Sequence, residues 1–189
     1  MFNYFKILFL AILLFAGCSN VPSTAEIDSD IGLLDKEIKE ATATVQDYSG
    51  GLLAILANVR LETLQSTKAM LEQKKTGLKR YIPVSYSVDG KKYSPPENKN
   101  DLLQELKQDI ENLKNDLAKD EKESDQYGGG LLGVLSLTQI ATVKNSIAFL
   151  EQRRLLLKYD IPYYSILPAT SKSNEPSFKP TPGKDIDKF

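Results

Sequence analysis

Apolar residues recur in the N-terminal half of the chain with the spacing of an amphipathic helix. They step alternately by four and three residues, which places their side chains on one stripe of a helix, as in a coiled-coil seam. The members of this seam are Ile27, Ile31, Leu34, Ile38, Ala41, Val45 and Tyr48. The positions between them are largely charged, as a solvent-facing helix surface requires. The pattern predicts a helix over residues 26–48 with one buried face.

The same pattern returns 79 residues later. Residues 26–86 align with residues 105–165 without a gap, and 19 of the 61 pairs are identical, whereas roughly four would be expected by chance. The second seam contains Leu103, Leu106, Ile110, Leu113 and Leu117, then the polar Asp120 and Ser124, and finally Tyr127. Two copies of this length predict one domain built from two like halves, because a solenoid needs more repeats.

Each copy is predicted to be a helix, a glycine break and a second helix. The breaks are Gly50-Gly51 in the first copy and Gly128-Gly129-Gly130 in the second. Each glycine costs about 1 kcal/mol in a helix interior relative to alanine, so we expect the chain to reverse there, with a kink as the alternative. The second helices then cover about 52–80 and 131–159, and Pro83 and Pro162 end them, because the residue before a proline avoids the helical region.

These elements predict an all-α fold in which two duplicated helical hairpins form an antiparallel four-helix bundle or coiled-coil-like domain. Both glycine turns should lie at one end and both Ile-Pro segments at the other. Between the copies, Val88-Asp89-Gly90-Lys91 is a turn signal that allows a small β-hairpin. After Leu167 the chain is rich in Pro, Ser and Lys, a composition that predicts a disordered tail.

The first twenty residues have a different character. Lys6 precedes an unbroken apolar run from Ile7 to Ala16, which suits a secretory signal and is too short to span a bilayer. The run ends in Phe15-Ala16-Gly17-Cys18. Here the chain resembles bacterial lipoprotein signal peptides, which have small residues before an invariant cysteine; Phe15 stands where that family more often has Leu. The alternative is a plain signal peptide or an uncleaved anchor with an incidental cysteine.

The resemblance implies that the signal is cut before Cys18 and that this thiol is acylated, usually with the new amine as well. Two or more acyl chains hold a protein firmly on a membrane. Ser19 follows the cysteine where the inner-membrane retention signal of this family has Asp, which favours the outer membrane in a Gram-negative host. The predicted organisation is a signal peptide (1–17), a lipidated tether (18–25), the first hairpin (26–86), a linker (87–104), the second hairpin (105–165) and the tail (166–189).

Composition narrows the function by exclusion. The 24 basic and 25 acidic side chains give a net charge of −1, which excludes a polybasic nucleic-acid-binding protein. The chain has no His and one Cys, so it lacks the commonest general base and transition-metal ligand and has no internal disulfide. We therefore expect no enzyme, no cofactor and no metal site.

Two features remain as candidates for chemistry. Glu72 and Glu151 are aligned carboxylates that a duplication can bring together for acid/base work or cation binding. Basic residues follow both of them directly, so a solvated or salt-bridged helix face is the simpler interpretation. The three glycines before residue 131 could accept an anion at a helix N-terminus, but they lack the Lys and Ser/Thr of a phosphate loop.

The apolar residues after each glycine break are the candidate partner-binding residues, namely Leu52, Leu53, Leu131 and Leu132. In one interpretation they form an apolar tip that contacts a partner protein or a second membrane. In the other they fill the end of the core, as apolar stripes usually do. The leading functional hypothesis is a non-enzymatic envelope lipoprotein that acts as a scaffold or docking protein or associates with itself. The alternative is a membrane-active or exclusion-type lipoprotein that uses these tips.

Overall fold

The computed structural model describes residues 24–163 apart from residues 49, 83, 89 and 128. Within them the helices are α2 (Thr24–Asp47), α3 (Gly51–Lys79), α4 (Lys99–Ser124) and α5 (Gly130–Lys158). Strands β1 (Ser87–Val88) and β2 (Lys91–Lys92) pair antiparallel between α3 and α4, with Ser87 opposite Lys92. The predicted all-α bundle of two helical hairpins is confirmed, as is the small β-hairpin in the linker.

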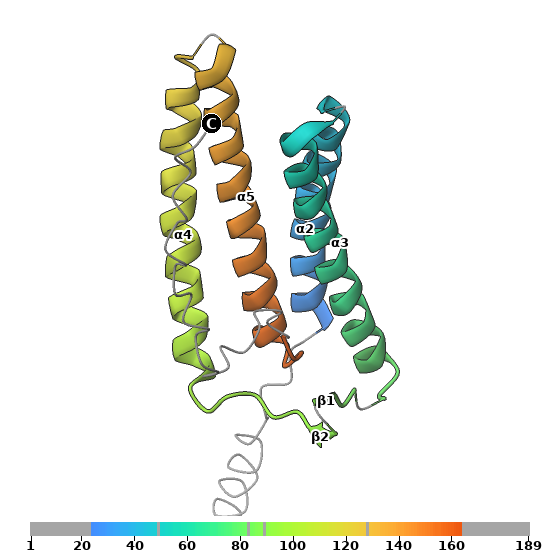
Figure 1. The fold of residues 1–189 in the computed structure, drawn as a ribbon. Helices are drawn as coiled ribbons and strands as arrows, with labels where there is room; N and C mark the ends of the chain where they lie inside the picture. Colours follow the sequence, from blue (N-terminus) through green and yellow to red (C-terminus); the bar gives the residue numbers. More distant parts are fainter. Residues whose placement is uncertain (1–23, 49, 83, 89, 128, 164–189) are drawn as a thin grey trace, which may run out of the picture.

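The two hairpins stand side by side (Figure 1). Helix α2 packs against α3 and α4 against α5, so the chain reverses at both glycine breaks, and the alternative of a kink is wrong. The hairpins meet where α5 packs on α3, while α4 packs on no described helix other than α5. Both glycine turns lie at one end, called here the tip (residues 50–56 and 129–135). The linker and the ends of α3 and α5 lie at the other, the base.

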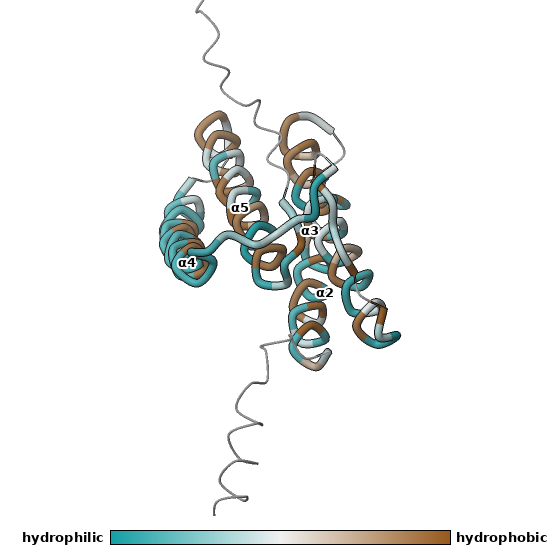
Figure 2. The backbone as a smooth tube through the Cα atoms, turned by 90° about the horizontal axis from the view of Figure 1, so that it is seen from below, coloured by the Kyte–Doolittle hydropathy of each residue, from teal (hydrophilic) through white to brown (hydrophobic). Residues whose placement is uncertain are grey.

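The core is concentrated toward the base. The α2 seam supplies Ile27, Ile31, Leu34 and Ala41, all buried, which confirms the predicted register. Large side chains from α3 and the end of α5 complete the cluster: Leu64, Leu71, Ala148, Leu155, Leu156, Tyr159 and Ile161. Helix α4 buries only Leu106 and Ile110, and it is predominantly hydrophilic where α5 is hydrophobic (Figure 2). The two halves therefore contribute unequally to one core.

Two threonines of α3 lie in this core without a polar partner from another helix. The Thr63 hydroxyl donates to the Val59 carbonyl at 2.8 Å, and the Thr67 hydroxyl donates to the Thr63 carbonyl at 2.7 Å. A hydroxyl that bonds to the carbonyl one turn earlier is satisfied within its own helix. These residues therefore pack as small, β-branched core residues despite their polarity.

The second helices of both copies end in the same way. Tyr81 and Asp160 occupy aligned positions and both adopt the left-handed conformation, with φ of 54° and 55°. The amide of Ile82 donates to the Gly77 carbonyl at 2.9 Å, and that of Ile161 to the Leu156 carbonyl at 2.8 Å, which is the Schellman arrangement. Both helices thus end three residues before Ile82 and Ile161, close to the ends predicted from the prolines.

The copies differ at the aligned pair Gly77 and Leu156. Leu156 is buried in the core, whereas a Cβ added at Gly77 would collide with the side chain of Val84. The linker therefore packs onto α3 at the point where α5 carries a large side chain. At this aligned position the first copy has no core side chain, and the Val84 side chain of the linker occupies the space.

Candidate functional site

The glycine turns have backbone conformations that explain their residue type. Gly51 has φ of 77°, Gly129 of 117° and Gly130 of 72°, all in a region that residues with a Cβ rarely adopt. Gly50 comes directly before α3, while Gly128 is outside the described residues. Of the predicted turn glycines that the structure describes, Gly51, Gly129 and Gly130 thus have a backbone that favours glycine, whereas Gly50 has an extended backbone with φ of 166°.

The leucines that follow the turns project largely into solvent. Leu131 is 75% exposed, Leu132 62% and Leu52 57%, whereas Leu53 is only partly exposed and faces the other hairpin. The expectation that these residues fill the end of the core is therefore wrong for Leu52, Leu131 and Leu132. Other exposed apolar residues of the tip are Ile55, Val134 and Leu135. Together they form an apolar surface on the first turns of α3 and α5.

The exposure follows from the way the hairpins diverge. At the base, large core side chains hold α5 against α2 and α3. Toward the tip the facing positions are small, with Ala41 on α2, Ala57 on α3 and Ala141 on α5. The hairpins separate there and enclose a cleft of about 640 Å³, the inter-hairpin cleft. No pattern in the sequence signals this cleft, because each hairpin by itself has an ordinary amphipathic seam.

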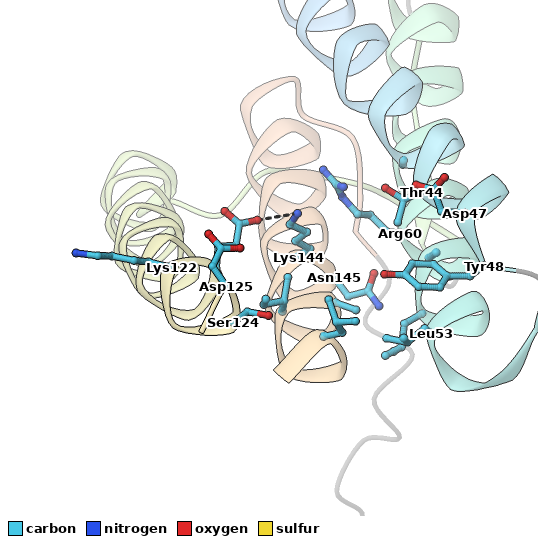
Figure 3. A pocket seen from close by; sticks show the side chains of 17 residues that line it. Thr44, Asp47, Tyr48, Leu53, Arg60, Lys122, Ser124, Asp125, Lys144 and Asn145 are labelled. Atoms are coloured by element: carbon cyan, nitrogen blue, oxygen red, sulfur yellow. Dashed lines mark ion pairs between the residues drawn. The ribbon is translucent and has the colours of Figure 1, made fainter. Parts of the chain in front are cut away.

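The inter-hairpin cleft is lined by apolar residues with charged groups at its sides (Figure 3). Arg60 of α3 pairs with Glu40 at 3.2 Å, and Lys144 of α5 pairs with Glu121 at 2.8 Å. Asn145, next to Lys144 on α5, also lines the cleft, and its Oδ1 is buried with no hydrogen-bond donor. The arrangement can accommodate a ligand, and it contains no nucleophile paired with a base.

At the base, a group of polar side chains joins the two hairpins. Asp30 of α2 accepts a hydrogen bond from the Tyr159 hydroxyl at 2.6 Å and from Lys158 Nζ at 2.8 Å. Burial of the phenol, followed by its hydrogen bond to Asp30, raises the pKa of Tyr159 far above its ordinary range. Lys99 at the start of α4 pairs with Asp160 at 2.6 Å. These contacts support the base and form no catalytic set.

The aligned carboxylates proposed for acid/base work or cation binding are occupied by ion pairs. Glu72 lies 3.6 Å from Lys68 on its own helix, while Glu151 pairs with Lys114 of α4 at 3.3 Å and with Arg154 at 2.8 Å. The salt-bridge interpretation is confirmed for both. Among the described residues, no group of three or more potential metal-binding side chains occurs.

Burial raises the pKa of the Glu37 carboxyl on α2, and the nearby Glu151 adds to this shift while Arg60 opposes it. Glu37 and Glu151 line a smaller hollow of about 290 Å³ beside α2, α4 and α5, together with the exposed Leu33. The hollow carries Lys114 and Arg154 as well, so its charges are largely balanced. It has the character of a solvated seam between helices.

Cys18, the predicted lipidation site, lies outside the described residues. Among the described helices, α5 is the one that is long and apolar enough to cross a membrane, a criterion that core helices of soluble proteins also meet. Comparison with protein-family models, with curated proteins and with solved structures finds no match.

Proposed function

We propose that the protein is a lipoprotein of the bacterial cell envelope, anchored through acylated Cys18, that docks another envelope component through its tip. It acts without catalysis. In a Gram-negative host the residue after the cysteine, Ser19, favours the outer membrane. The support comes from the lipoprotein-like signal in the sequence and from the apolar tip of the bundle.

The position of the tip relative to the anchor makes docking geometrically reasonable. Helix α2 begins at Thr24, at the base, six residues after Cys18. Helix α5 has 29 residues and is therefore about 43 Å long at 1.5 Å per residue. A membrane attached near Thr24 leaves the tip pointing away from the lipid. The tip is then free to reach a partner that is not in the same membrane leaflet.

The observation that carries the proposal is the exposure of Leu131 and Leu132. Fully burying a leucine side chain stabilises a complex by about 1.5–3 kcal/mol, and several apolar residues lie together at the tip. Contiguous apolar patches on a soluble domain mark interaction sites. A partner with a complementary apolar surface gains this free energy on binding.

Site-specific photocrosslinking in cells tests the proposal. The probe replaces Leu131 or Leu52 at the tip, and a control probe replaces Lys107, which is exposed on α4. The proposal expects adducts with another envelope protein from the tip positions and none from Lys107. Adducts within the protein alone, or equal adducts from all three positions, would contradict a docking tip.

The apolar character of α5 favours one other function, a membrane-active lipoprotein whose tip enters a second bilayer. The first turns of α5 are highly exposed, and the helix as a whole contains an 18-residue window apolar enough for a membrane span. In that case the probe at Leu131 labels lipid in place of protein. The purified chain would then also release dye from vesicles in which it is not itself anchored. Replacing Leu131 and Leu132 with Ser would abolish this release.

A further inference from the structure

The inter-hairpin cleft contains a buried polar side chain that has no partner within the chain. Asn145 is 7% exposed, and its Oδ1 accepts no hydrogen bond. Its carboxamide points from α5 into the space between the hairpins, toward Tyr48 and Leu53 (Figure 3). A buried acceptor left unsatisfied costs free energy, so a molecule that brings a donor into the cleft recovers it.

The cleft around Asn145 has the size and lining of a small-molecule site. Its volume of about 640 Å³ lies within the range of about 300–1,000 Å³ usual for ligand pockets. Ala57 and Ala141 create the space, and Leu56, Leu137 and Ile140 supply an apolar wall. Ligand sites typically combine such a wall with a few polar groups that orient the ligand.

The charged residues of the cleft oppose its closure. Arg60 on α3 and Lys144 on α5 belong to opposite hairpins and both line the cleft. Closure would bring these two cations together and remove them from water, which is costly for charged groups. Each keeps its carboxylate partner, Glu40 or Glu121. The lining as a whole carries three acidic and three basic side chains, so it favours a ligand without net charge.

We propose that the inter-hairpin cleft binds a neutral aliphatic amide. The alkyl chain lies against the leucine and isoleucine side chains, and the amide N–H donates to Asn145 Oδ1. This site is separate from the exposed apolar tip, and it depends neither on the lipid anchor nor on docking. The occupied cleft satisfies the polar group that the empty one leaves buried.

The test uses octanamide and its matched control, N,N-dimethyloctanamide, which has the same alkyl chain but no N–H donor. Each is titrated into the ¹⁵N-labelled full chain in phospholipid nanodiscs, with empty nanodiscs as the blank, and binding is followed by NMR. Octanamide is expected to shift the side-chain amide of Asn145 and the backbone amides of Ala57 and Ala141. The dimethyl compound should bind about five- to tenfold more weakly, because one hydrogen bond is lost.

Three variants make the result specific. Asn145→Leu should reduce octanamide affinity to that of the dimethyl compound, and Ala141→Leu, which fills the cleft, should weaken both compounds. The double variant Leu131→Ser/Leu132→Ser should leave octanamide binding unchanged, because these side chains lie outside the cleft. Equal affinity for the two amides, unchanged binding by Asn145→Leu, shifts confined to residues 131–135, or no binding at all would each overturn the proposal.

Discussion

Tyr159 and its neighbour Lys158, at the end of α5, both donate hydrogen bonds to Asp30 of α2. Tyr159 is fully buried, and its hydroxyl donates to Asp30 at 2.6 Å. Replacing it with Phe keeps the ring in the core and removes this bond to a charged acceptor. We expect the free energy of unfolding, measured by urea denaturation, to fall by about 2 kcal/mol. An unchanged value would mean that Lys158 satisfies Asp30 alone.

We also expect the Tyr159 phenol to make the free energy of unfolding depend on pH. Burial and Asp30 hold the pKa of Tyr159 well above the value near 10 of an unfolded tyrosine. As the pH rises through about 10, the unfolded chain loses this proton while the folded chain keeps it, so the free energy of unfolding falls. The decline between pH 9 and 11 should be steeper in the wild type than in Tyr159→Phe, by up to about 1.4 kcal/mol per pH unit. Parallel curves would contradict this assignment.

The close packing at Gly77 leads to a prediction about overpacking. A Cβ there collides with the Val84 side chain, so Gly77→Ala should destabilise the protein by about 1–3 kcal/mol through overpacking. Combining it with Val84→Ala should reverse the effect, because alanine is the better helix former by about 1 kcal/mol. A double-mutant cycle by thermal unfolding measures the coupling. Additive losses would show that the linker does not rest on α3.

At the scale of residues, the sequence could predict the seam but not every member of the core. Ile27, Ile31 and Leu34 follow from spacing, because a stripe of large apolar side chains has few alternatives to burial. Thr67 is equally buried, but a polar residue is not expected in the core from sequence. Its burial is possible because its hydroxyl donates to a carbonyl of its own helix. Asn145 is less predictable still, because its burial depends on the cleft between the hairpins.

Among the elements, α4 is the one with the weakest attachment. It packs only on α5 within the described part of the chain, and it buries only Leu106 and Ile110. Local stability follows buried apolar contact, so backbone amides of α4 from about residue 117 onward should exchange with deuterium before those in the middle of α3. Leu106→Ala should accelerate exchange in α4 more than in α2. Uniform exchange in all four helices would contradict this order.

The arrangement of these elements was only partly predictable. The glycine breaks and the heptad seam determine two hairpins, because adjacent glycines disfavour a continuous helix and the seams need a partner. The second helices of both copies, α3 and α5, meet in the middle, and α2 and α4 lie outside them, yet α2 buries four residues and α4 only two. The polar Asp120 and Ser124 in the second seam are the sequence signal of this difference, because they stand where the first seam has Ala41 and Val45. The candidate tip is predictable because it consists of apolar residues directly after the glycines. The inter-hairpin cleft is not predictable, because it depends on how the two hairpins pack on each other.

For the whole molecule, the tip and the core should respond differently to substitution. Leu131→Ser/Leu132→Ser should change the free energy of unfolding by less than about 1 kcal/mol, because exposed positions contribute little to stability. Leu71→Ala, at a fully buried position, should cost about 3–5 kcal/mol. Urea denaturation compares the two. A large loss in the tip variant would mean that its leucines support the fold and are not available to a partner.

The hairpins are joined at the base and separated at the tip, so a small rotation of one hairpin at the base produces a larger displacement at the tip. With an arm of about 43 Å, a rotation of one degree at the base moves the end of a helix by roughly 0.75 Å. The width of the inter-hairpin cleft is therefore sensitive to small adjustments at the base, where Tyr159 of one hairpin donates a hydrogen bond to Asp30 of the other. A molecule bound between the two hairpins therefore strains the contacts that join them at the base. Binding in the inter-hairpin cleft is thus coupled mechanically to the base, the end of the protein at which α2 begins.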